Sequence, residues 1–189
     1  MMRFLQLCSF CAVVVVCFSC APDSREIAAK PSTYYNIDSL LTASVSNCLR
    51  QSTTVQVDKQ VSIDDEIEEK RMTMDSAALA KEVGLFRLLD INQSNLTFSY
   101  EETVSNGAYA YQLKEREKQE GVLNLTITTE GKRTIVAGEF AEKNSLYYTR
   151  RNMRIGIEDG CLKYYQVAGV QKMTFKDTVS YTLKGAILE

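Results

Sequence analysis

The start of the chain places one cysteine, Cys20, where export and processing chemistry would act. Arg3 is the only charged residue before Asp23, and residues 4–18 are apolar apart from one glutamine and one serine. A positive start followed by an apolar stretch of roughly 7–15 residues is the pattern of a secretory signal. This stretch is shorter than the run of about 20 apolar residues that a membrane-spanning helix needs. Ser19 is small enough for the pocket of a signal peptidase, so we expect cleavage before Cys20.

The residues that end this segment, Cys17-Phe18-Ser19-Cys20, resemble the lipobox of bacterial lipoproteins. The resemblance implies that Cys20 becomes the first mature residue and carries acyl chains such as palmitate. Ala21, in place of aspartate after the cysteine, implies the outer membrane; we expect its periplasmic face, with the cell surface as second choice. The alternatives are an ordinary secretory signal, which leaves a soluble periplasmic protein, and a retained single-pass anchor. The rest of the chain resembles no characterised family at the level of motifs.

We expect three parts: a signal peptide at 1–19, a lipidated tether at 20–33 and a single domain at 34–189. The tether holds both prolines of the chain, Pro22 and Pro31. Its residues 21–33 reach at most roughly 45 Å when fully extended, at about 3.5 Å each. The domain is therefore expected to work close to a bilayer.

The composition excludes several classes of function. The chain lacks histidine, which is the commonest general base and the usual metal ligand, so we expect no metal site and no cofactor. It has 22 basic and 24 acidic residues, and this balance gives no basic excess for nucleic-acid binding. Two cysteines lie beyond residue 20, Cys48 and Cys161. They form either one disulfide in an oxidising compartment or two separately buried thiols.

Four side chains in the C-terminal half are candidate binding residues. Arg150 and Arg154 would share one face of a strand and meet anionic head groups or a polysaccharide; the structural alternative is protection of a sheet edge. Tyr148 and Tyr165 belong to adjacent tyrosine pairs, in which one ring points inward and the other outward. An outward ring would stack on a sugar or a partner protein, whereas the structural alternative is cross-strand aromatic pairing.

The densest acidic cluster is a candidate for a calcium site. It consists of Asp64, Asp65, Glu66, Glu68 and Glu69. Its spacing does not match an EF-hand loop, and the glycine of such a loop is missing. We interpret the cluster as a solvated polar edge.

Hydrophobic periodicity predicts the elements that position these residues. Apolar residues three to four apart predict helices at 39–50, capped by Asp38, and from Asp75 to about residue 89. Alternation predicts short strands on both sides of residues 58–60 and a series of hairpins after residue 96, with Asp159-Gly160 as the strongest turn signal. The predicted class is α+β: two N-terminal amphipathic helices covering one face of an antiparallel β-meander of about six to eight strands.

This order of elements is similar, at the level of fold and without a shared motif, to the open half-barrels of periplasmic lipoprotein carriers and their lipidated receptors. The resemblance implies an apolar concavity that binds lipid or acyl chains. We therefore expect a membrane-anchored envelope lipoprotein that acts as a non-enzymatic binding or envelope-assembly module, with an envelope protein or lipid as partner. The alternative is an enzyme that uses carboxylates or lysine on an envelope glycan. No catalytic residue is assigned.

Overall fold

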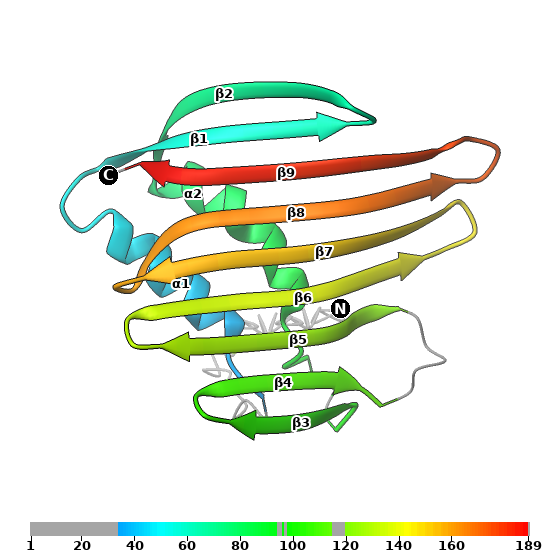
Figure 1. The fold of residues 1–189 in the computed structure, drawn as a ribbon, viewed down its shortest axis with the longest axis horizontal. Helices are drawn as coiled ribbons and strands as arrows, with labels where there is room; N and C mark the ends of the chain where they lie inside the picture. The colour runs from blue at the N-terminus through cyan, green and yellow to red at the C-terminus, as the bar shows by residue number, and fades with distance from the viewer. Residues whose placement is uncertain (1–33, 94–95, 97, 115–119, 189) are drawn as a thin grey trace, which may run out of the picture. The chain divides into compact units, whose positions relative to one another are not determined.

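Nine antiparallel strands form one sheet in the part of the chain that the computed structural model describes, namely residues 34–93, 96, 98–114 and 120–188 (Figure 1). The strands are β1 Thr54–Ile63, β2 Glu66–Asp75, β3 Tyr100–Ser105, β4 Ala108–Leu113, β5 Gly121–Glu130, β6 Arg133–Lys143, β7 Tyr147–Glu158, β8 Cys161–Met173 and β9 Thr178–Leu188. Their order across the sheet is β2-β1-β9-β8-β7-β6-β5-β4-β3. Strands β3 to β9 thus form a meander, and the β1–β2 hairpin joins it beside β9.

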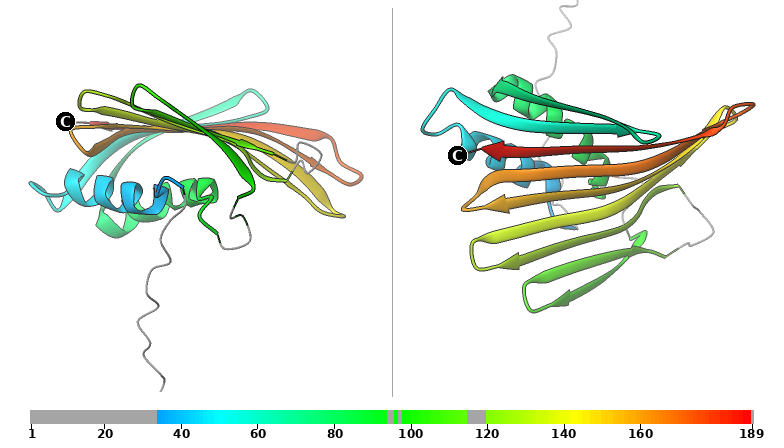
Figure 2. Two further views of the ribbon diagram at one scale, coloured as in Figure 1. Left: turned by 90° about the horizontal axis from the view of Figure 1, so that it is seen from below. Right: turned by 45° about the horizontal axis from the view of Figure 1, so that its top comes forward.

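The helices are short and lie on one face of the sheet (Figure 2). They are α1, Ile37–Cys48, then α2, Ser76–Val83, and the 3₁₀-helix η1, Gly84–Leu89. Asn36 caps α1 by accepting a hydrogen bond from the backbone N–H of Ser39 at 2.9 Å. Asp75 caps α2 in the same way, accepting from the N–H of Ala78 at 2.8 Å. Each cap satisfies one of the free N–H groups at a helix start.

The predicted α+β class with two N-terminal helices is wrong, because the chain is mostly β. The β1–β2 hairpin separates α1 from α2, and residues 58–60 continue β1 instead of forming a turn. The turn lies at Asp64 and Asp65, both at positive φ. β2 escaped prediction because it is an edge strand: most of its side chains are exposed, so its sequence lacks the alternation of a half-buried strand. The sheet therefore has nine strands instead of six to eight.

The core lies between the helices and the sheet face that they cover. Leu41, Leu79 and Leu89 of the helical segments are at most 2% exposed, as are Met153 and Leu125 of the sheet. A Cβ added at Gly138 would lie 2.8 Å from Leu89 Cδ2, so η1 packs directly on the backbone of β6. Close packing of this kind leaves no room for a side chain at position 138.

Two adjacent tyrosines on β8 each cover a glycine on a neighbouring strand. Tyr164 pairs with Gly156 of β7, and Tyr165 pairs with Gly185 of β9. A Cβ added at either glycine would approach the tyrosine ring to 2.1 Å. Because neighbours on a strand point to opposite faces, the ring of Tyr165 faces the helices and that of Tyr164 faces away. Aromatic cover of this kind compensates for the missing side chain of a strand glycine.

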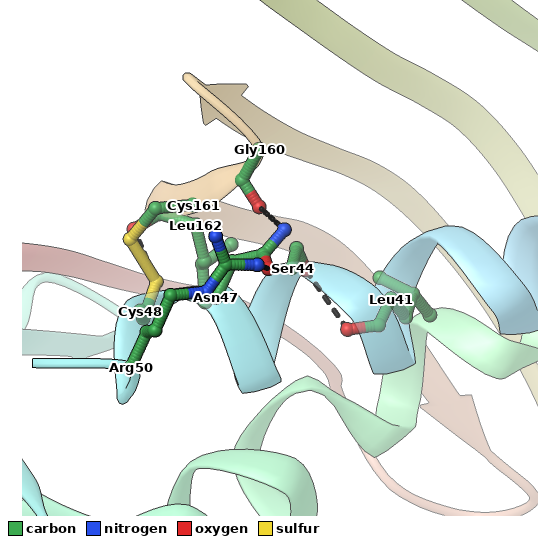
Figure 3. Close-up of a disulfide and its surroundings, with 8 residues drawn as sticks. All are labelled: Leu41, Ser44, Asn47, Cys48, Arg50, Gly160, Cys161 and Leu162. Atoms are coloured by element: carbon green, nitrogen blue, oxygen red, sulfur yellow. Dashed lines mark hydrogen bonds between the residues drawn. A yellow bond between two sulfur atoms is a disulfide. The ribbon is translucent and has the colours of Figure 1, made fainter.

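A disulfide joins Cys48 at the end of α1 to Cys161 at the start of β8 (Figure 3). Beside it, Asn47 Nδ2 donates a hydrogen bond to the backbone carbonyl of Gly160 at 3.1 Å. Of the two alternatives for these cysteines, the structure has the bridge. Ser19, Cys20 and the remaining positions of the expected signal and tether lie outside the described residues, which all belong to one compact unit, Ser32–Glu189.

Candidate functional site

The sheet face away from the helices carries a polar groove of about 720 Å³ across β2, β1, β9 and β8. Its side chains form two neighbouring cross-strand rows. The first row contains Arg71, Asp58, Ala186 and Tyr164, and the second contains Glu69, Gln60, Lys184 and Gln166. The rows are neighbours because side chains two residues apart on each strand point to the same face.

An ion pair closes the β2 end of the first row. The guanidinium of Arg71 donates to both carboxylate oxygens of Asp58, from Nε at 2.6 Å and from the terminal nitrogen at 2.9 Å. This hydrogen bonding lowers the pKa of Asp58 below its ordinary value. Bidentate pairing fixes the planes of both groups. Asp58 is therefore ionised at neutral pH and presents a rigid polar wall.

The second row combines a carboxylate, two side-chain amides and a cation. Gln60 Nε2 donates to Glu69 Oε1 at 2.6 Å, which fixes both side chains. Lys184 lies between Gln60 and Gln166 in the row, and it makes no ion pair with any other residue that the structure describes. Arg154 of β7 is the next member after Gln166 and extends the row to a fifth strand. The row thus offers amide groups and positive charge to a ligand.

Small residues form the floor of the groove and one aromatic ring borders it. Ala186 stands between Asp58 and Tyr164, and Gly185 also contributes to the lining. The ring of Tyr164 lies over Gly156 at the β8 end. A flat aromatic surface above small residues leaves space for a ligand to lie along the sheet.

A second, smaller groove of about 400 Å³ continues along the same face. Its floor contains the cross-strand row Ser62, Thr182, Ala168 and Asn152, which follows the second row of the first groove. Arg150 also lines it, and its guanidinium is paired with Glu139. Polar groups therefore extend over much of this face, as suits an elongated ligand.

Three of the four candidate binding residues from the sequence lie on this face. Arg154 borders the first groove and Arg150 lines the second. Tyr148 alternates with the buried Thr149 and so points to the same face as Arg150. Tyr165 does not: its side chain is 1% exposed in the core, and its hydroxyl donates to Glu82 at 2.9 Å. Its neighbour Tyr164 takes the place at the groove.

The helix-covered face has a polar contact of its own. Glu82 of α2 pairs with Lys59 at 2.6 Å as well as accepting from Tyr165. Around them the side chains of Leu79, Val83 and Phe86 are at most 3% exposed. Close to this contact, helix side chains therefore pack against the sheet, and the acyl-chain site expected from the sequence stays a prediction.

The acidic cluster at the β1–β2 turn is not assembled as a metal site. Asp64 accepts hydrogen bonds from the backbone N–H and the hydroxyl of Ser180, at 2.8 and 3.2 Å. Glu69 lies on β2, where it lines the polar groove instead of joining Asp64 at the turn. Within the described ranges no three cysteine, aspartate or glutamate side chains converge to hold a metal ion.

Comparison with known proteins gives no relative: no family model, no curated protein and no solved structure matches the chain. In the portion of the chain that the structure covers, the helices are also too short or too polar to cross a membrane. The grooves themselves are therefore the basis for a functional proposal. Sequence reasoning missed Asp58, Gln60 and Lys184, and it considered Glu69 only as part of the acidic cluster, since these residues come together only when β1 pairs with β2 and β9.

Proposed function

We propose that this protein is a lipid-anchored, non-enzymatic binding module of the bacterial outer membrane, facing the periplasm, and that its polar groove holds an acidic envelope glycan. The observation that carries the proposal is the groove itself, in which fixed carboxylate, amide and guanidinium groups line the floor and one aromatic ring borders the β8 end. Planar polar side chains hydrogen-bond sugar hydroxyls, and an aromatic face stacks on a sugar ring. This is the combination that an oligosaccharide site needs.

The positive groups of the groove argue for an acidic glycan. Asp58 and Arg71 neutralise each other, and Glu69 keeps its charge because its partner Gln60 is neutral. Two cations, Lys184 and Arg154, have no ionic partner within the described part of the chain and outnumber that carboxylate. Positive groups along a groove attract anionic ligands and raise their local concentration. Glycan strands that carry carboxylates fit this distribution better than neutral polysaccharides.

The same geometry favours binding over hydrolysis. A glycoside hydrolase needs one carboxylic acid that keeps its proton near neutral pH and a second carboxylate as base or nucleophile. Arg71 lowers the pKa of Asp58, so this side chain is unsuited to donate a proton. The Glu69 carboxylate is engaged by Gln60. Both acidic groups of the groove thus serve to position their neighbours.

The proposed ligand is tested with solubilised peptidoglycan strands, which carry carboxylates, and with neutral dextran as the control glycan. We expect saturable binding of the strands by calorimetry, no binding of dextran and no shortening of the strands. Lys184→Gln and Tyr164→Leu should each weaken binding about tenfold, equivalent to about 1.4 kcal/mol. Arg133→Gln, which removes an exposed charge outside the groove, should leave binding unchanged. Equal affinity in all three variants would show that the groove is not the glycan site.

The proposed anchor is tested separately in cells with labelled palmitate. The natural chain should incorporate the label and fractionate with the outer membrane, whereas Cys20→Ser should carry no label and appear in the soluble periplasmic fraction. Cys48→Ser is the matched control, because it removes a thiol from the folded domain and should retain the label. Lipid on the Cys20→Ser variant would disprove the anchor.

A further inference from the structure

Two neighbouring turns form an apolar tip at one end of the sheet. The β6–β7 turn exposes Leu146 (67%), and the β8–β9 turn exposes Met173 (41%) and Phe175, whose side chain is fully exposed. Hydrogen bonds hold the turns together: the backbone N–H of Thr174 donates to the carbonyl of Leu146 at 2.8 Å, and its hydroxyl bonds the carbonyl of Ser145 at 3.2 Å. Figure 1 shows the two turns side by side, at the right-hand end of β6 to β9.

The exposure of Phe175 has no explanation in the folding of the domain. Its side chain contacts no part of the core, and its φ of 65° lies in the left-handed region, which is a genuine outlier for a bulky residue. Glycine or asparagine would suit this backbone better. Large apolar residues gathered at an exposed tip are typical of a contact surface.

The charges around the tip indicate what it contacts. Lys143, Lys172 and Lys176 surround the apolar residues, all three are exposed, and none forms an ion pair inside the described ranges. Asp177 is the acidic neighbour within the β8–β9 turn. Apolar side chains surrounded by lysines match the layers of an anionic bilayer, in which phosphates lie above the acyl chains.

The described chain begins beside the middle of the strands, away from the tip. Along the cross-strand rows, Tyr111 of β4 lies level with Met153 of β7 and Val167 of β8, whereas Met173 lies at the end of β8. Tyr34, the first described residue, packs against Tyr100 at the start of β3 and Tyr111 near the end of β4, with ring centroids 5.7 and 5.5 Å apart. The apolar tip is therefore a surface separate from the start of the described chain.

We propose that Leu146, Met173 and Phe175 insert into the headgroup region of an anionic phospholipid bilayer while Lys143, Lys172 and Lys176 contact its phosphates. The domain then stands with this end on the membrane and turns its polar groove toward the periplasm. The inference rests on the proposed membrane location and adds a second, non-covalent contact to the lipid on Cys20. The function of this second contact is to orient the domain on the membrane.

The absence of tryptophan from the chain allows a direct test. Phe175→Trp gives the protein a single tryptophan at the tip, which can be excited at wavelengths where tyrosine does not absorb. Val104→Trp is the control, because Val104 is 59% exposed and lies near the end of β3, at the opposite end of the sheet. The lipidated variants are reconstituted into vesicles of phosphatidylethanolamine and phosphatidylglycerol, with and without bromine on the acyl chains.

We expect brominated lipid to quench the fluorescence of the Phe175→Trp variant about twofold or more, because inserted side chains reach the acyl boundary, and to leave that of the Val104→Trp variant unchanged. Adding Lys172→Glu and Lys176→Glu to the tip variant should abolish its quenching, whereas adding Lys132→Glu should not. If the protein floats with the vesicles but the fluorescence of the Phe175→Trp variant is not quenched, the tip contact is disproved and the lipid anchor is not. Equal quenching of the two tryptophan variants would overturn the orientation. Failure to float would overturn the membrane location, and the tip contact with it.

Discussion

Cys48 and Cys161 are 113 positions apart in the sequence, and their disulfide brings the two Cα atoms to 4.8 Å (Figure 3). Cys48 is the last residue of α1, and Cys161 is the first residue of β8. The bridge therefore fixes the C-terminal end of the first helix to the β7–β8 hairpin. It links the layer of helices to the sheet covalently at one corner.

Replacing both cysteines by serine should lower the free energy of unfolding by about 4 kcal/mol, because the bridge closes a loop of more than 100 residues in the unfolded chain. Urea unfolding followed by circular dichroism measures the loss. The natural protein with reductant should shift its midpoint to that of the double variant, and the double variant should not respond to reductant. Identical midpoints with and without the bridge would contradict this account.

Glu82 is expected to matter more for stability than any exposed ion pair, because its carboxylate serves both Lys59 and Tyr165 in a half-buried position. Glu82→Ala should destabilise the fold by about 2–3 kcal/mol, because it leaves the Lys59 ammonium and the Tyr165 hydroxyl without the acceptor that they share. Glu82→Gln should cost less, because it retains an acceptor for the hydroxyl.

The exposed pair of Asp38 and Arg87, both more than half exposed, supplies the control for Glu82. Arg87→Ala should cost less than about 1 kcal/mol because solvent screens such a pair. Thermal unfolding of the three variants gives the ranking. A loss for Arg87→Ala equal to that for Glu82→Ala would argue that burial does not decide the difference.

The two tyrosine–glycine pairs should respond differently to an added methyl group. Gly185→Ala drives a Cβ into the ring of Tyr165, which the core holds in place, and should cost about 1–3 kcal/mol or more. Gly156→Ala makes an equally short contact with Tyr164, but that ring is partly exposed and can turn away. Denaturant midpoints compare them. The prediction fails if Gly156→Ala proves the more damaging substitution.

Alkaline pH should unfold the domain through Tyr100 and Tyr111. Burial raises the pKa of both hydroxyls to about 12; an electrostatic contribution from Tyr34 adds to the shift at Tyr100, and a hydrogen bond with Glu102 adds to that at Tyr111. In the unfolded chain both ionise near 10. Their contribution to stability is therefore complete below about pH 10 and is lost as the pH rises toward 12.

The near-ultraviolet absorbance of tyrosinate, measured together with circular dichroism, follows this transition without interference from tryptophan. We expect a group of tyrosines that ionises only as the β signal disappears. In urea all ten should titrate together near pH 10. Titration of every tyrosine near pH 10 while the β signal persists would disprove the coupling.

Local signals in the sequence located many turns and one cap correctly. Asp159 and Gly160 form a hairpin turn with both residues at positive φ, as their types predict. Asp75 caps the second helix, as expected, whereas Asn36 and not Asp38 caps the first. Adjacent polar residues near a helix start compete for the same role, and only the packed backbone decides between them.

The candidate site was only partly visible in the sequence. Alternation along a strand was enough to place Arg150 and Arg154 on one face, with Arg151 on the other, where its Nε donates to the hydroxyl of Tyr181. The alternation of residues along the strand does not show which ring of the Tyr164–Tyr165 pair is buried. That choice depends on which face the helices cover, and both rings have the same chemistry.

The sequence by itself indicated the antiparallel meander and its main turns, because these depend on neighbours in the chain, but not the mostly β class. Its composition excludes histidine chemistry, and the lipid on Cys20 stays a prediction. The tertiary structure alone decided that β1 pairs with β9, which brings Asp58 and Gln60 beside Ala186 and Lys184. It also decided that the turns carrying Leu146 and Phe175 meet at one end of the sheet. Both arrangements join residues far apart in the chain, and their free energy comes from burying a shared face, which no local pattern records.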